Sequence, residues 1–162
     1  MSEILEQQYE YIRRTRELLL SFLEEIPVQK LHETVPGFGH GCILRTHIHV
    51  IDCYRRWLGS FAFHERWADF RDTADDDIKH YDVKKVRDRF KEVDDIVQKF
   101  FHEFHDRWLE SIENEVGWMD QALSVTPLFL LTHTETHEFH HKGQIVSMAR
   151  HLGYTPPITD LD

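Results

Sequence analysis

Four of the thirteen histidines in this chain gather in one short stretch, Thr132 to Gln144. His137 and His141 are four residues apart, so on a helix their side chains lie on the same face, one turn apart. Two imidazoles in this relation can bind one metal ion, although they can also be two hydrogen-bonded core histidines. Apolar segments on both sides of the stretch indicate a helix with one buried face. We therefore expect a metal site on the last helix of the chain.

The same stretch contains the zincin protease motif H-E-x-x-H, read from His137 through Glu138 to His141. Zincins take a third ligand from further along the chain or from another helix, and only 21 residues follow His141. Ser147 stands where a metzincin would have its third histidine. We therefore do not expect a protease, but Glu138 remains a candidate general base near the metal.

A third ligand must come from another part of the chain, and the predicted second helix offers His47 and His49. On a helical wheel His47 lies among apolar residues such as Ile43 and Ile51, which favours it as the inward-facing ligand. His49 lies beside Arg45 and other charged residues, on what resembles a solvated face. The residue pattern leaves both histidines open.

The histidines are positioned by four stretches that have the apolar spacing of amphipathic helices. We expect helices over residues 3–25, 42–62, 83–115 and 127–152. Pro27 ends the first helix, Asp82 can cap the third, and Thr126 with Pro127 begins the fourth, which Gly153 ends. No stretch shows the alternation of a β-strand. This pattern predicts an all-α, four-helix up-down bundle, with residues 1–162 forming a single domain.

Two further features of the sequence suggest how the bundle is completed. Residues 63–81 are polar and acidic, and a connection of this length often covers a functional site. Gly143 lies inside the predicted last helix, where glycine costs about 1 kcal/mol relative to alanine. We expect Gly143 to allow the close approach of another backbone segment.

The net charge of −10, with histidine neutral, excludes several classes of partner. An acidic surface repels phosphate backbones, so we expect no nucleic-acid partner.

The apolar runs are too short to cross a bilayer, and the N-terminus lacks the apolar segment of a signal peptide. Cys42 and Cys53 are about 16 Å apart on one predicted helix, too far for a disulfide. We expect a cytoplasmic protein with no membrane partner.

Two motifs resemble the DinB family of metalloenzymes (the DinB/YfiT group): HVIDCYRRWLG in the second predicted helix, and THEFHHKGQI followed by GYTPP in the last. The resemblance extends over nearly the whole chain in helix order. It implies a four-helix bundle that is usually a homodimer. It also implies a metal held by one histidine of the second helix and by the H-x-x-x-H pair of the fourth, here His137 and His141.

In that family the ligand of the second helix opens an H-x-x-(D/A)-x-(E/Y) run, which here begins at His49 and continues with Asp52 and Tyr54. The resemblance therefore favours His49 as the third ligand, with His47 in reserve. Family members commonly have arginine before the glycine of the last motif, where this chain has Lys142.

Three neutral histidines leave coordination positions open, which is typical of catalytic metal sites. The histidine set suits zinc, nickel, iron or manganese, which geometry rather than ligand type distinguishes, and we take zinc or nickel as the first expectation. Some relatives use a low-molecular-weight thiol, such as bacillithiol or mycothiol, as cosubstrate in transferase or isomerase reactions. By this resemblance we expect a thiol S-transferase acting on a small-molecule substrate, with Tyr54 or Glu138 handling protons. The alternatives are a metal-dependent hydrolase and a non-catalytic metal- or ligand-binding stress-response protein.

Overall fold

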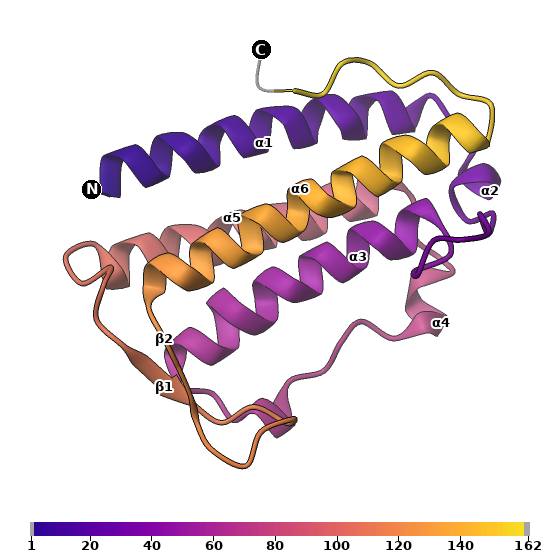
Figure 1. The fold of residues 1–162 in the computed structure, drawn as a ribbon. Helices are drawn as coiled ribbons and strands as arrows, with labels where there is room; N and C mark the ends of the chain where they lie inside the picture. Colours follow the sequence, from indigo (N-terminus) through magenta and orange to yellow (C-terminus); the bar gives the residue numbers. More distant parts are fainter. Residues whose placement is uncertain (1, 161–162) are drawn as a thin grey trace.

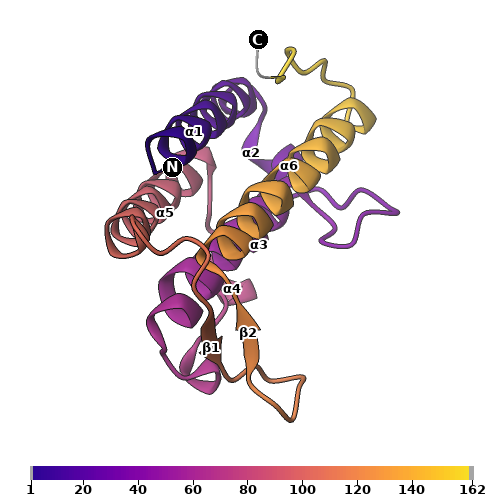
Figure 2. The same cartoon turned by 60° about the vertical axis from the view of Figure 1, so that its left-hand side comes forward.

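The computed structural model describes residues 2–160, and its body is formed by four long helices that pack together (Figure 1). They are α1 (Ser2–Glu24), α3 (Ile43–Tyr54), α5 (Val83–Phe104) and α6 (Pro127–His151). Two one-turn helices, α2 (Val28–Leu31) and α4 (Asp75–Ile78), lie in the connections. Figure 2 shows α1 beside α5 and α3 beside α6. The predicted all-α four-helix bundle is confirmed.

The four helices do not strictly alternate in direction, so the up-down order that we expected was wrong. In Figure 1, α3 and α5 run the same way, opposite to α1 and α6. The cause is the long segment after α3, which runs back along the bundle before α5 begins, as in other bundles with a crossover connection. Because this segment returns beside α3, it lies close to the helix that carries His49.

Local sequence signals place the starts of α5 and α6 where we expected them. The Thr126 Oγ1 atom accepts a hydrogen bond from the Phe129 amide (3.1 Å), and Pro127 occupies the first turn of α6. The Asp82 carboxylate accepts one from the Lys85 amide (2.7 Å) at the start of α5. These are the two caps that the sequence predicted.

The predicted third helix is too long, because α5 ends at Phe104 rather than near residue 115. The chain then forms an antiparallel pair of three-residue strands, β1 (Ile112–Asn114) and β2 (Leu123–Val125), with Ile112 opposite Val125. Trp108 keeps the apolar spacing of α5 but packs back on the rings of Phe100 and Phe101 from outside the helix. Strands this short carry no readable alternation, and the expectation of no strands was wrong.

The second predicted helix is continuous but changes its winding. After α3 the chain forms a π-helical turn over Arg55–Ser60 and a 3-10 turn over Phe61–Phe63, and it stops at His64, whose φ is +59°. The following segment is tied to α3 by the buried Asp52 carboxylate. That carboxylate accepts hydrogen bonds from the Thr73 amide (2.7 Å) and hydroxyl (3.0 Å).

Gly143 is exposed and does not lie against another backbone. A Cβ atom added there would have no neighbour within 4 Å among the described residues beyond its own surroundings in α6. The expectation of a close backbone approach was therefore wrong.

Between residues 2 and 160, no helix is long and apolar enough to cross a membrane.

Candidate metal centre

The histidines of α3 and α6 meet where these two helices pack against each other. The ring centroids of His49 and His141 are 4.8 Å apart, as are those of His49 and His137. The rings of His137 and His141 are 4.4 Å apart. The i, i+4 spacing on α6 therefore presents two imidazoles to the single imidazole that α3 contributes.

A fourth histidine comes from the loop between α2 and α3. The His40 ring stacks on His49 at 3.9 Å and meets His141 edge-on at 5.2 Å. His40, His49 and His141 each have one ring nitrogen that lies within 4.8 Å of the corresponding nitrogen of the other two. These three residues could therefore hold a metal ion. The structure thus brings together His49 and His141 as expected, with His137 beside them and His40 added.

His47 lies on the opposite face of α3, in the core. Its ring is 4% exposed and packs edge-on against Phe90 of α5 at 5.9 Å. The side of α3 with His49 and Arg45, which resembles a solvated face on the wheel, instead borders a cavity. Of these two histidines of α3, His49 is the one whose ring contacts the rings of His137 and His141.

The imidazoles of this cluster are kept neutral by their surroundings. Burial, together with the nearby His40 and His141 rings, lowers the pKa of His49 to about 4. Burial and the neighbouring histidines lower the pKa of His137 to about 3, and burial lowers the pKa of His141. Neutral imidazoles have a lone pair for a metal at neutral pH.

A hydrogen bond orients the His141 ring as a ligand, whereas His137 has an unpartnered ring nitrogen. The Nδ1 atom of His141 donates to the side-chain oxygen of Gln144 (2.8 Å), which leaves the Nε2 lone pair of His141 free. The Nε2 atom of His137 is buried and has no hydrogen-bond partner within residues 2–160. Buried polar atoms normally have a partner, so a metal would satisfy His137 as well as fit the nitrogen donor set.

Glu138 and Tyr54 lie together, but in the interior of the bundle. The Glu138 carboxylate accepts hydrogen bonds from the Arg16 guanidinium (2.7 and 2.9 Å) and from the Tyr54 hydroxyl (2.8 Å). Arg16 also donates to Asp94 (2.9 Å). Burial, and then the neighbouring Glu138 charge, raises the pKa of Tyr54 well above its ordinary value. This buried network joins α1, α3, α5 and α6.

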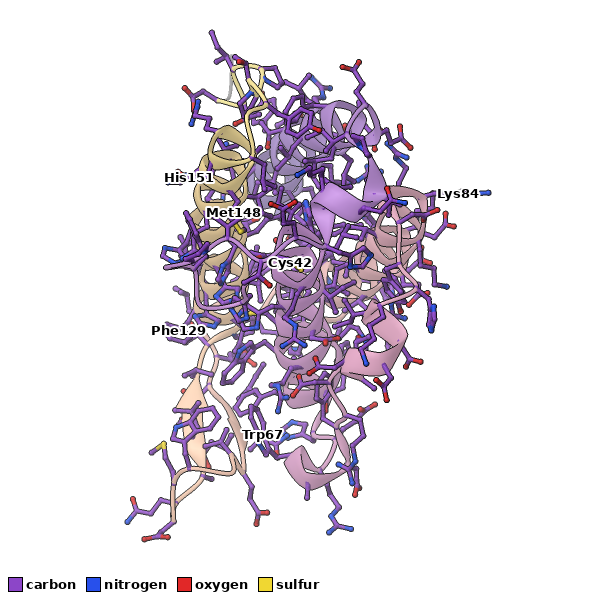
Figure 3. The ribbon with its side chains drawn as sticks, turned by 90° about the vertical axis from the view of Figure 1, so that its right-hand side faces the viewer. Cys42, Trp67, Lys84, Phe129, Met148 and His151 are labelled. Atoms are coloured by element: carbon purple, nitrogen blue, oxygen red, sulfur yellow. The ribbon has the colours of Figure 1, made fainter. Side chains whose placement is uncertain are left out.

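A cavity of about 350 Å³ opens directly beside the histidines. His40, His49 and His137 line one part of it, and Arg45 and Arg56 line another. Its remaining lining residues come from α3, from the crossover segment and from α6: Ile48, Asp52, Cys53, Trp57, Asp72, Thr73, Asp75, Ile78 and His133. In Figure 3, Phe129 and His151 mark the two ends of α6, Cys42 marks the start of α3, and Trp67 belongs to the crossover segment. Four of the lining residues, Asp72, Thr73, Asp75 and Ile78, belong to segment 63–81, so this segment forms a wall of the cavity.

The sequence profile described as the DinB family matches residues 1–162, the whole of the chain. The protein belongs to the DinB family. This DinB protein combines a four-helix bundle with a three-histidine cluster that could hold a metal. No curated protein matches the sequence significantly.

Sequence reasoning about this DinB protein missed His40. The residue lies in the segment Pro36–Cys42, where Gly37, Gly39 and Gly41 mark a turn and no helical spacing relates His40 to the other histidines. The one available signal was a histidine among glycines just before a histidine-bearing helix. His133 also lines the cavity, one turn before His137 in α6.

Proposed function

We propose that this protein is a metal-dependent enzyme whose histidine cluster holds a divalent transition ion, zinc or nickel in the first instance. The observation that carries the proposal is that three of the clustered histidines line a cavity of about 350 Å³. A structural metal site is closed by protein ligands, whereas a catalytic one keeps a position open to a small molecule. The reaction that we favour is transfer of a low-molecular-weight thiol to an electrophilic small molecule.

The chemistry required of the cavity is the formation of a sulfur nucleophile. A divalent metal supplies Lewis acidity, which lowers the pKa of a thiol in contact with it. The thiol gives its proton to solvent, its sulfur forms a bond to the electrophilic carbon, and the leaving group departs with the electrons of the broken bond. His49, His137 and His141 present neutral nitrogen donors for the ion, and Gln144 holds the His141 ring in place.

The two arginines of the cavity support a thiol that carries a carboxylate. Arg56 forms an ion pair with Asp72 (2.7 Å), and Arg45 forms one with Asp75. The carboxylates of Asp72 and Asp75 are about two-thirds exposed, at 65% and 64%, so these pairs contribute little to stability. A substrate carboxylate can therefore replace either aspartate at small cost.

We assign Glu138 and Tyr54 a positioning role in this enzyme. Both side chains hydrogen-bond within the buried network of Arg16, and neither lines the cavity beside the histidines. Glu138 follows His137 directly in α6, so its bonds to α1 and α3 fix the rotation of α6 that turns His137 and His141 toward His49.

The test is metal content by elemental mass spectrometry of the wild type and of His49→Ala, His141→Ala and His47→Leu. We expect about one metal per chain in the wild type and in His47→Leu, because His47 lies in the core, and loss of metal in the other two variants.

The loaded wild type is then incubated with a carboxylated thiol and an electrophile, and thioether product is sought by mass spectrometry. Absence of metal from the wild type after reloading at neutral pH would refute the metal site. Bound metal with ester hydrolysis but no thioether would replace the transferase by a hydrolase.

A further inference from the structure

Four imidazoles converge on the candidate metal centre, but they are held in two different ways. His49, His137 and His141 belong to α3 and α6, which pack against each other over much of their length. His40 belongs to the loop that precedes α3, and its ring stacks on His49 at 3.9 Å. Three donors are thus fixed by the bundle, and the fourth is carried by a loop.

The loop that carries His40 is joined at its base by a backbone hydrogen bond and has glycines with open surroundings at its tip. The amide of Val35 donates to the carbonyl of Gly41 (2.7 Å), which joins the two ends of the loop. Gly37 and Gly41 have φ values of +90° and +75°, a conformation that favours glycine. A Cβ atom added at Gly37 or Gly39 would meet nothing within 4 Å in the described part of the chain. The loop is therefore open at these two glycines, and it contacts the end of α6 through Phe38, whose ring meets His151 edge-on at 5.8 Å.

His40 also separates two cavities. Its ring lines the cavity of about 350 Å³ beside the histidines and a second one of about 690 Å³ between its loop and α4. Arg45 and Asp75 border both cavities. A His40 ring that leaves the other histidines can therefore enter adjacent open space without any helix moving.

The number of donors matters for the chemistry. Four imidazoles complete the tetrahedral shell that zinc adopts in closed sites, whereas three leave the open position of a catalytic site. We propose that His40 is an exchangeable fourth ligand, which occupies the ion's open position at rest and is displaced by a small thiol that enters from the cavity. This inference rests on the proposed metal site and adds a role for the loop.

The experiment counts the histidine ligands directly. Protein labelled with ¹⁵N in its histidines is loaded with ¹¹³Cd²⁺, and one-bond cadmium–nitrogen couplings are assigned by NMR with and without 2-mercaptoethanol. We expect four couplings at rest and three with thiol, the lost one being that of His40. His40→Ala should bind cadmium with three couplings whether or not thiol is present. His102→Ala, which removes an exposed histidine of α5, should behave as the wild type does.

Each other outcome decides a different question. Couplings from His49, His137 and His141 alone in the wild type would overturn the role of His40 and leave the proposed function standing. A His40 coupling that persists with thiol would make His40 a permanent ligand and overturn exchange. Failure of the wild type to bind cadmium or zinc would remove the proposed function itself, together with this inference.

Discussion

At the scale of single residues, the environment of each side chain in the cavity decides its chemistry. Arg56 lies across the rings of Trp67 and Phe70, at 4.6 and 4.3 Å from their centroids, so its guanidinium is held in one orientation. Cys53 lies one helical turn beyond His49, and its Sγ atom is 3.9 Å from His133 Nε2. The Arg56 guanidinium is thus placed to bind an anion, whereas the Cys53 thiol is protected from reaction.

Arg56→Met should weaken the binding of a carboxylated thiol roughly 10- to 150-fold, since a hydrogen bond to a charged group is worth about 1.5–3 kcal/mol. The measurement compares N-acetylcysteine with its uncharged amide as ligands of the zinc-loaded protein by titration calorimetry. The amide should bind equally to both proteins. Arg66→Met, at a side chain that is 80% exposed, is the matched control and should change neither affinity. Equal losses for both ligands would mean that Arg56 does not recognise the carboxylate.

Cys53 should resist alkylation in the native protein. Burial raises the pKa of its thiol to about 12, so at pH 8 the thiol is protonated, and only the thiolate reacts. We expect Cys53 to react with iodoacetamide at least ~100-fold more slowly than in the urea-unfolded chain, as measured by peptide mass spectrometry. Raising the pH toward 10 should speed the reaction. Native labelling of Cys53 as fast as that of the half-buried Cys42 would contradict this prediction.

At the scale of helices, the position of α6 depends on one buried ion pair and on the intrinsic stability of the helix. Arg16 of α1 is 6% exposed and reaches both Glu138 of α6 and Asp94 of α5. Within α6, Gly143 contributes backbone freedom but no packing. Substitutions at Arg16 and at Gly143 should therefore change the free energy of unfolding in opposite directions.

Arg16→Met should destabilise the protein by about 3–5 kcal/mol, because it leaves the Glu138 carboxylate buried and unpaired. The free energy of unfolding is measured by urea denaturation. Arg14→Met is the control on the same helix: the Arg14 side chain is 68% exposed and forms an ion pair with Glu10, so we expect a change within about 0.5 kcal/mol. Equal stability of Arg16→Met and the wild type would show that the network does not anchor α6.

Gly143→Ala should stabilise the protein by about 0.5–1 kcal/mol, because alanine restricts the unfolded chain and is the better helix former. The added methyl group has room in the described structure. Urea denaturation provides the measurement, and Gly37→Ala provides the contrast, because its φ of +90° strains any residue with a Cβ atom. Destabilisation by Gly143→Ala would point to a neighbour, such as a second copy of the chain, at this exposed position.

At the scale of the whole molecule, the histidines link segments that are far apart in sequence. The loop before α3, α3 itself and α6 each contribute at least one ring. An ion bound among them would cross-link these segments in the folded state alone. Metal binding and global stability should therefore be coupled.

Zinc at 100 times its dissociation constant should stabilise the fold by about 2.7 kcal/mol, and thus raise Tm by roughly 5–10 °C. Scanning calorimetry of the metal-free and zinc-loaded protein measures the shift, and a chelator should reverse it. His141→Ala should show no shift, because it lacks a ligand. An equal shift in His141→Ala would place the stabilising zinc outside this centre.

Local spacing in the sequence was sufficient to predict the elements and part of the site. The apolar periodicity and the caps at Asp82 and Thr126 located the helices, because these signals act within a few residues. The pair His137 and His141 followed from the helical repeat alone. The end of α5 and the two short strands could not be predicted, because they depend on how the chain packs over the end of the bundle.

Only the tertiary structure decided which groups meet across helices. The rotation of α3 in the bundle turned His49 toward α6 and His47 into the core, and a wheel drawn for one helix cannot contain that information. Packing against α1 gave Glu138 a buried partner in Arg16, and the fold of a glycine-rich loop brought His40 onto His49. The helical repeat fixes positions within one element, whereas contacts between distant segments are set by packing of the whole chain.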